Sequence, residues 1–213
     1  MARERPPYMW NAIIALILTV IIFVGVFLLG YTISYYKYKG LVQSQEDLRY
    51  SLLSFEVERD LLGNGCEDFD AFLFTEEMDH LGGIIGVLEE RLGKNDEQVL
   101  DQKKIYSLLE TRHFLYVRSH NEECEDDKID VILFFYSNKE DEQEEAERLG
   151  YMLTTLKRED PDIMIYSFDY DMDSSLIGIL IKKYNISRPN QLVINEKTLL
   201  NVFEDIDDIR DQL

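Results

Sequence analysis

Two cysteines and two short E-x-x-H segments carry the residue types in this sequence that can do redox or metal chemistry. Cys66 and Cys124 are its two cysteines. Glu77–His80 and Glu110–His113 each place a carboxylate and an imidazole three residues apart, on one face of a helix. Two thiols can form a structural bridge or a redox pair, and paired E-x-x-H motifs occur in carboxylate-bridged di-metal bundles. The available chemistry depends on the helices that hold these residues.

Apolar spacing predicts three helices before residue 125, over about 41–62, 67–92 and 97–119. The short turn near residue 95 makes the second and third helices antiparallel neighbours. Cys66 and Cys124 lie equally far from this turn along the chain, so they should meet at the open end of the hairpin. We expect a disulfide there, worth about 4 kcal/mol in the chain-entropy model. Two unrelated free cysteines are the alternative.

The same geometry would set Glu77 opposite His113 and His80 opposite Glu110. A di-metal site in such a bundle also needs one glutamate from each of two further helices. The predicted first helix offers one, and the sequence supplies no fourth donor. We therefore interpret the four residues as Glu–His hydrogen bonds in a polar layer, or as exposed residues. They stay weak candidates for a metal site, and no cofactor is predicted.

The N-terminal segment has the length and composition of a membrane-spanning helix. Residues 12–30 are almost wholly apolar, and no charged residue occurs from 6 to 36. About 20 such residues cross a hydrocarbon core of ~30 Å. A cleaved signal peptide has a shorter apolar run of about 7–15 residues and a small-residue cleavage site, which the sequence lacks. We expect a retained single-pass anchor over residues 1–40, in the cell membrane.

The net charge bears on possible partners. The chain holds 42 acidic and 22 basic residues, a formal net charge of −20. Such a surface repels nucleic acid and anionic lipid headgroups, so neither is expected as a ligand. The sequence shows no phosphate-binding loop, nucleophile–base pair or zinc spacing, and no small-molecule substrate is evident.

The side of the membrane is the next expectation. Basic residues on the two sides of the apolar segment are nearly balanced. A short N-terminal tail and a long C-terminal part favour a globular part outside the cytoplasm, where disulfides persist. Asn185–Ile186–Ser187 is an N-glycosylation sequon that could be used on that side of the membrane.

From residue 128 the pattern becomes an alternation of strands and helices. Predicted strands cover 129–137, 163–171 and 191–195, and predicted helices cover 138–160, 173–186 and the end from about 201. A strand–helix–strand order of this kind implies a right-handed crossover and a parallel pair. The sequence therefore predicts an α/β domain over 128–213, after a helical region over 41–125.

This order resembles the thioredoxin superfamily. "FFYSN" is similar to the family's first strand and its loop, and "IYSFDYDMDSSL" to its second strand. "YNISRPNQLVINEKT" is similar to the family's "Y-x-I…P-T-L-V-I-x-G-K" segment. The resemblance implies a mixed sheet with flanking helices, and it makes Pro189 the candidate cis-proline at the start of an antiparallel edge.

The sequence departs from the family where its redox chemistry takes place. A thioredoxin-type oxidoreductase needs a thiolate at the start of the helix after the first strand, where the helix dipole lowers its pKa. Residues 138–145, "NKEDEQEE", contain no cysteine. The resemblance then implies a groove for extended peptide, without redox activity. Its candidate lining residues are Pro189, Arg188, Asn138, Glu140 and Gln143.

Two functions from different classes follow. The preferred one is a membrane-anchored, redox-inactive thioredoxin-like protein that binds or scaffolds a protein partner, with no catalytic residues. The alternative is a membrane-anchored thiol–disulfide oxidoreductase or relay that uses Cys66 and Cys124. It requires the helical hairpin to present both thiols near Pro189.

Overall fold

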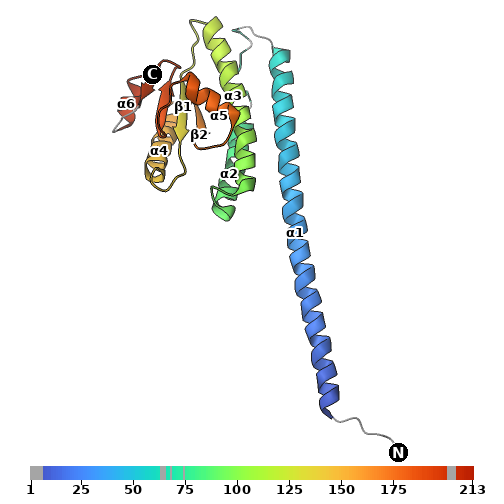
Figure 1. Cartoon of the computed structure of the whole chain (residues 1–213). Coiled ribbons are helices and arrows are strands. Elements are labelled where there is room, and N and C mark those ends of the chain that lie inside the picture. Colours follow the sequence, from blue (N-terminus) through green and yellow to red (C-terminus); the bar gives the residue numbers. More distant parts are fainter. Residues whose placement is uncertain (1–6, 63–65, 68, 74, 201–204) are drawn as a thin grey trace, which may run out of the picture. The chain divides into compact units, whose positions relative to one another are not determined.

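The computed structural model describes residues 7–62, 66–67, 69–73, 75–200 and 205–213 (Figure 1). The chain divides into two compact units, Met1–Asp47 and Leu48–Leu213. Helix α1 (Pro7–Leu62) begins in the first unit and ends in the second.

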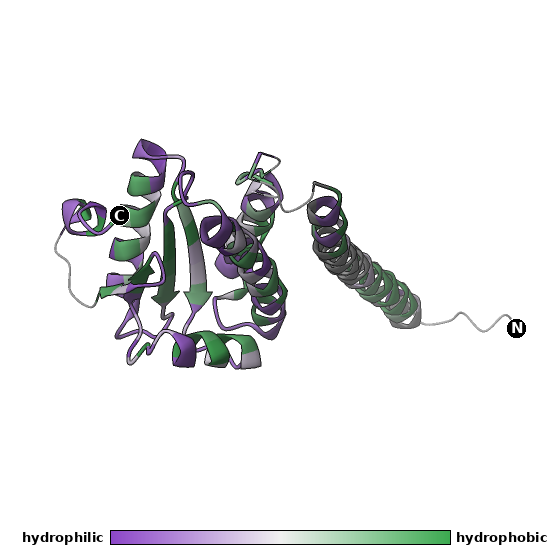
Figure 2. Ribbon diagram, turned by 90° about the horizontal axis from the view of Figure 1, so that it is seen from above, coloured by the Kyte–Doolittle hydropathy of each residue, from purple (hydrophilic) through white to green (hydrophobic). Residues whose placement is uncertain are grey.

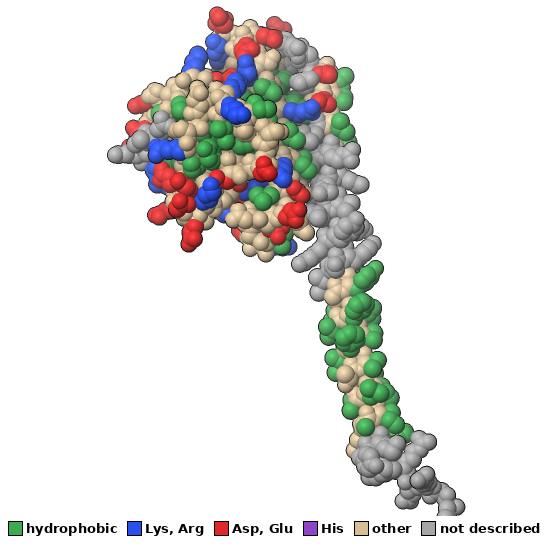
Figure 3. All heavy atoms as spheres, viewed as in Figure 1, with side chains coloured by type: hydrophobic (Ala, Val, Ile, Leu, Met, Phe, Trp, Pro, Cys, Tyr) green, Lys and Arg blue, Asp and Glu red, His purple; other side chains and the backbone are tan. Residues whose placement is uncertain are grey.

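The first unit consists of the N-terminal part of α1. Its segment Trp10–Thr32 is long and apolar enough to cross a membrane, and its described side chains are hydrophobic or uncharged in Figure 3. The hydroxyls of Thr19 and Thr32 donate to the carbonyls of Ala15 and Leu28, which satisfies two polar groups inside the apolar run. The prediction of an N-terminal apolar helix of spanning length is confirmed.

The second unit is built around a mixed four-stranded sheet of order β2-β1-β3-β4. The central strand β1 (Val131–Tyr136) pairs in parallel with β2 (Met164–Asp169) and antiparallel with β3 (Gln191–Ile194). The short strand β4 (Thr198–Leu200) pairs antiparallel with β3. Strand β1 is an almost continuously buried run, as its sequence predicts. The predicted parallel pair is confirmed.

One face of the sheet is covered by α4 (Gln143–Glu159) and α6 (Ile206–Arg210). Alternate residues of β1 and β3 point to this face, because successive strand side chains point to opposite sides. Figure 2 shows the hydrophobic strands lying between helices whose hydrophobic and hydrophilic residues alternate. Buried members of this cluster include Ile132, Phe134, Leu149, Leu153, Leu192 and Ile209.

The other face packs against α3 (Glu97–Glu123) and α5 (Ser175–Lys183). This cluster is the larger of the two and also takes in residues of the loop before α2. Its buried members include Val131, Leu133, Phe135, Phe114, Val117, Ile177 and Leu180. The sheet is thus a layer between two sets of helices, which accounts for the burial of both faces of β1.

Helix α3 also covers the outer edge of β2. An edge strand exposes unpaired backbone groups, and in β2 one of them is the N–H of Ser167. This N–H donates to Oε1 of the buried Glu110 at 3.0 Å. A side chain of α3 therefore takes the place of a further strand at this edge.

Helix α2 (Thr75–Leu92) forms an antiparallel hairpin with α3, and Met78 and Leu81 pack against Leu109. The predicted start of this helix near residue 67 is wrong. Asp70 accepts a hydrogen bond from the N–H of Phe72 at 2.9 Å. Such an aspartate-centred turn competes with a helix for the same backbone groups, and it delays the helix to Thr75.

Three other helices are shorter than predicted. The helix predicted at 138–160 begins at Gln143, the helix predicted at 173–186 spans Ser175–Lys183, and the last helix begins at Ile206. Residues 201–204, where the last helix was predicted to start, lie outside the described residues. Asn138 and Glu140 consequently lie in a loop rather than on a helix.

Cys66 and Cys124 form a disulfide, with their Cα atoms 6.0 Å apart. The bridge joins the segment after α1 to the residue that follows α3, at the open end of the α2–α3 hairpin. The predicted pairing is confirmed.

Removing the bridge should destabilise the second unit by about 2–4 kcal/mol. The bridge closes a loop over a sequence separation of 58, which restricts the unfolded chain, and without it the unfolded state gains conformational entropy. We expect Cys124→Ser to lower the midpoint of denaturant unfolding of the detergent-solubilised chain. The double variant Cys66→Ser/Cys124→Ser is the control and should match the single one, since either substitution opens the bridge. An unchanged midpoint after reduction of the natural chain would contradict the prediction.

Candidate binding site

The loop after β1 and the turn before β3 meet at the carboxyl end of β1. The N–H of Asn190 donates to the carbonyl of Phe135 at 2.6 Å. The Asn190 side-chain amide donates to the carbonyl and to Oε2 of Glu142, at 3.1 and 3.0 Å. Residues 138–143 and the Pro189 turn, far apart in sequence, therefore lie side by side.

The prediction that Pro189 is a cis-proline is wrong. The described residues contain no cis peptide bond, and β3 begins at Gln191, two residues after the proline. Asn190 makes the turn instead, with a left-handed φ of 59°, a conformation that asparagine adopts more readily than most residues. The side chain of Gln191 completes the turn by accepting from the N–H groups of Ser187 and Arg188, at 2.9 and 3.2 Å.

Asn190→Ala should lower the unfolding free energy by about 2 kcal/mol, because it removes the side-chain hydrogen bonds to Glu142 and puts at positive φ a residue that adopts this conformation less readily than asparagine. Asn190→Gly loses the same hydrogen bonds but keeps the backbone freedom, so it should cost about half as much. Denaturant unfolding of both variants tests this. A glycine variant less stable than the alanine variant would contradict the assignment.

The five predicted groove residues all belong to the two segments that meet here. Asn138 is half-buried and donates to Oδ2 of Asp169 at 2.9 Å. Gln143 donates to Glu147 at 2.7 Å, and Pro189 is half-buried. Glu140 and Arg188 are exposed.

Charge also links the two segments. Hydrogen bonding from Arg148 lowers the pKa of Glu145 on α4, and the charge of Arg188 in the turn lowers it further. Glu145 therefore stays ionised, with Arg148 of α4 and Arg188 of the Pro189 turn near it.

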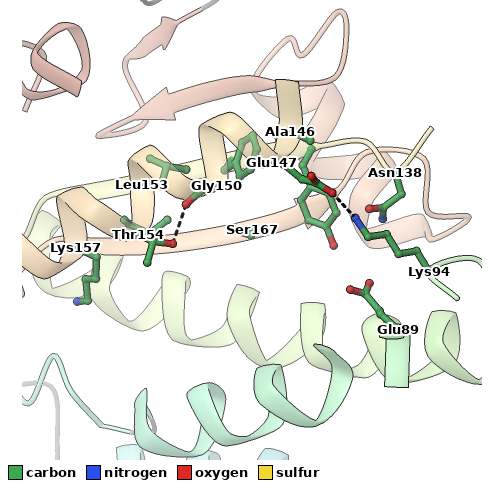
Figure 4. A pocket seen from close by; sticks show the side chains of 13 residues that line it. Glu89, Lys94, Asn138, Ala146, Glu147, Gly150, Leu153, Thr154, Lys157 and Ser167 are labelled. Carbon is green, nitrogen blue, oxygen red and sulfur yellow. Dashed lines mark hydrogen bonds and ion pairs between the residues drawn. The ribbon is translucent and has the colours of Figure 1, made fainter. Parts of the chain in front are cut away.

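A cavity of about 430 Å³ opens beside this region, between α4 and the residues around the end of α2 (Figure 4). Phe134, Leu153 and Ile165 give it an apolar lining, and Asn138 lies at its wall. The amine of Lys94 lies 3.2 Å from Oε1 of Glu147. This exposed ion pair connects the α2–α3 turn to α4 on one side of the cavity.

A buried lysine that the sequence analysis did not single out lies behind the cavity. The side chain of Lys103 is 5% exposed, and its amine lies 2.6 Å from Oε1 of Glu89 and 3.4 Å from Oδ2 of Asp169. Asn138 donates to the same oxygen of Asp169. These ion pairs and this hydrogen bond therefore connect α2, α3, β2 and the loop after β1. Lys103 lies three and seven residues before Tyr106 and Glu110 along α3, a helical spacing that could have revealed it.

The structure does not bring the two E-x-x-H motifs together. Glu77 and His80 are exposed on α2, whereas Glu110 and His113 are buried and turned to the sheet. Nδ1 of His113 is hydrogen-bonded to the hydroxyl of Tyr166 at 2.7 Å. Among the described residues, no group of three or more His, Cys, Asp or Glu side chains could hold a metal ion.

Burial makes this layer between α3 and β2 uncharged near neutral pH. It raises the pKa of Glu110 to about 8, an effect that the hydrogen bond from Ser167 offsets in part. It lowers the pKa of His113 to about 4 and raises the pKa of Tyr166. A protonated Glu110 and a neutral His113 fit a layer that joins helix to strand.

Comparison of the chain with protein-family models, with curated proteins and with solved structures gave no match.

Proposed function

We propose that this chain is a single-pass membrane protein with a redox-inactive, thioredoxin-like domain that binds an extended segment of a protein partner. The domain lies outside the cytoplasm in this proposal. The strand order, the parallel β1–α4–β2 crossover and the antiparallel β3–β4 edge support a thioredoxin-like arrangement. The helix Trp10–Thr32 supports the anchor, and the disulfide supports an oxidising compartment.

The observation that carries the proposal is the meeting of residues 138–143 with the Pro189 turn. Asn190 holds the two segments together at the carboxyl end of β1. In a redox-active member of the superfamily the first helix would present a thiolate at this place, and here the chain presents Asn138, Glu140 and Gln143. A junction of two segments with polar side chains and no thiol is suited to binding rather than to disulfide exchange.

The position of the disulfide counts against a thiol relay. Cys124 precedes the amino end of β1, whereas Asn190 bonds to Phe135 near the carboxyl end. Six residues of strand separate the two ends by about 16 Å. The two sulfurs are therefore not beside Pro189, the place that the relay requires.

The charge around this junction indicates what kind of partner segment would bind there. Glu140, Asp141, Glu144 and Glu145 are exposed in the loop and the first turn of α4. Carboxylates gathered there attract cations and repel other acids. We therefore propose a partner segment that is extended and rich in lysine or arginine.

A redox assay separates the two functions. The full chain in detergent should not catalyse the reduction of insulin by dithiothreitol above the uncatalysed rate, and Cys66→Ser should behave the same way. Turnover that Cys66→Ser abolishes would replace the binding proposal with the oxidoreductase.

A peptide titration tests the binding itself. Extended Lys/Arg-rich peptides should bind the full chain in detergent with an affinity that falls as salt rises. Glu140→Gln/Glu144→Gln should weaken this binding several-fold. The control Glu125→Gln/Asp126→Asn removes two exposed acids near the other end of β1 and should leave it unchanged. Equal losses in both variants would show attraction to the net charge alone and would defeat the proposed site.

A further inference from the structure

We propose that Asn185 is a site of N-linked glycosylation. Asn185–Ile186–Ser187 has the acceptor pattern N-x-S with no proline in the middle. The other asparagines in the printed sequence are not followed by serine or threonine two residues later. One site therefore accounts for any N-linked sugar that the chain carries.

The structure puts the acceptor where a large sugar can be carried without disturbing the fold. Asn185 is exposed and follows Tyr184, the residue that caps α5, with a left-handed φ of 54°. The N–H of Ile186 donates to the carbonyl of Ile181 at 3.0 Å, and the Ile186 side chain is buried. The buried isoleucine fixes the turn, and both Asn185 and Ser187 are exposed beside it.

A second observation indicates the compartment in which this reaction takes place. N-linked sugars are added on the side of the membrane where disulfides also form and persist, and the chain has a disulfide in the same unit as Asn185. The disulfide and the sequon are independent features of the sequence. They agree on a globular unit outside the cytoplasm.

The chemistry is a glycosyl transfer from a lipid diphosphate-linked oligosaccharide. A bond forms between Nδ2 of Asn185 and C1 of the first sugar, while the bond from C1 to the diphosphate oxygen breaks. The amide gives up one proton, and the lipid diphosphate leaves with the electron pair. This inference rests on the extracytoplasmic location in the proposed function, and it does not depend on the binding of a partner segment.

The test is expression of the full chain in a eukaryotic secretory host, followed by gel mobility with and without peptide N-glycosidase F. The natural chain should show one enzyme-sensitive shift. Ser187→Ala should lose it, and Ser187→Thr should keep it, because threonine preserves the acceptor pattern. Both variants leave Asn185 in place, which avoids putting another residue at positive φ. A non-reducing gel that shows the disulfide confirms that each variant is folded.

A positive control shows whether the transferase reaches this unit at all. Glu97→Thr turns the exposed Asn95 into a second acceptor on another surface turn and should add one further shift. A shift from Asn95 but not from Asn185 would overturn the proposal, as would a shift that survives Ser187→Ala. Absence of both shifts would also overturn it, because the unit would then face the cytoplasm.

Discussion

Replacing Lys103 with methionine should lower the unfolding free energy of the second unit by about 3–5 kcal/mol. Methionine keeps most of the volume but removes the cation between Glu89 and Asp169. The Asp169 side chain is 5% exposed and that of Glu89 is 22% exposed. Two carboxylates would then face each other with little water to screen them, and only the uncharged donors Asn138 and the N–H of Asp171 would remain on Asp169 among the described residues. Denaturant unfolding of the full chain in detergent measures the loss.

The neighbouring residue supplies a matched control for this prediction. Lys104 pairs with Asp101 at 3.3 Å, but its side chain is 44% exposed. Lys104→Met should therefore cost less than about 1 kcal/mol. Adding Asp169→Asn to Lys103→Met removes one of the two facing charges and should recover part of the loss. Equal effects of the two lysine variants would contradict the role given to Lys103.

The stability of the second unit should fall as the pH rises between about 4.5 and 8, through Glu110. Burial raises the pKa of Glu110 from 4.5 to about 8 in the folded chain. In this window the folded chain keeps the proton and the unfolded chain releases it, so a higher pH favours unfolding. The contribution of this group reaches at most about 5 kcal/mol at pH 8 and above.

Glu110→Gln isolates this contribution, because glutamine does not titrate and its carbonyl can still accept from the N–H of Ser167. The unfolding free energy of the variant minus that of the natural chain should be small at pH 4 and should grow with pH up to about 8. Parallel stability curves for the natural chain and Glu110→Gln would exclude a protonated Glu110.

The parts of the fold that the sequence predicts best depend on local patterns and on simple pairing geometry. The run 129–137 has the composition of a strand buried on both faces, and β1 is the central strand. The disulfide follows from the symmetry of a helical hairpin about its turn. It survives the late start of α2 because Cys66 lies outside the helix in either case.

The missed features depend on neighbours that a single sequence does not reveal. Helix α3 contacts α2, but it also contacts β2, and Phe55 of α1 packs against Tyr116 of α3. The hairpin geometry predicts that Glu110 and His113 face α2, but both side chains bond to β2 instead. Glu110 accepts a hydrogen bond from the N–H of Ser167, and His113 is hydrogen-bonded to the hydroxyl of Tyr166. The turn before β3 was attributed to Pro189 because proline is the unusual residue there. The next residue, Asn190, supplies the backbone conformation.

The place of the disulfide has a mechanical consequence for a protein pulled at both ends. Tension between helix α1 and the C-terminus would pass from Cys66 straight to Cys124 through the sulfur–sulfur bond. The 58-residue separation, roughly 200 Å of extended chain, would add no length to the stretched molecule while the bond is closed. The α2–α3 hairpin would thus be shielded from load, and reduction would release that hidden length in a single-molecule extension trace.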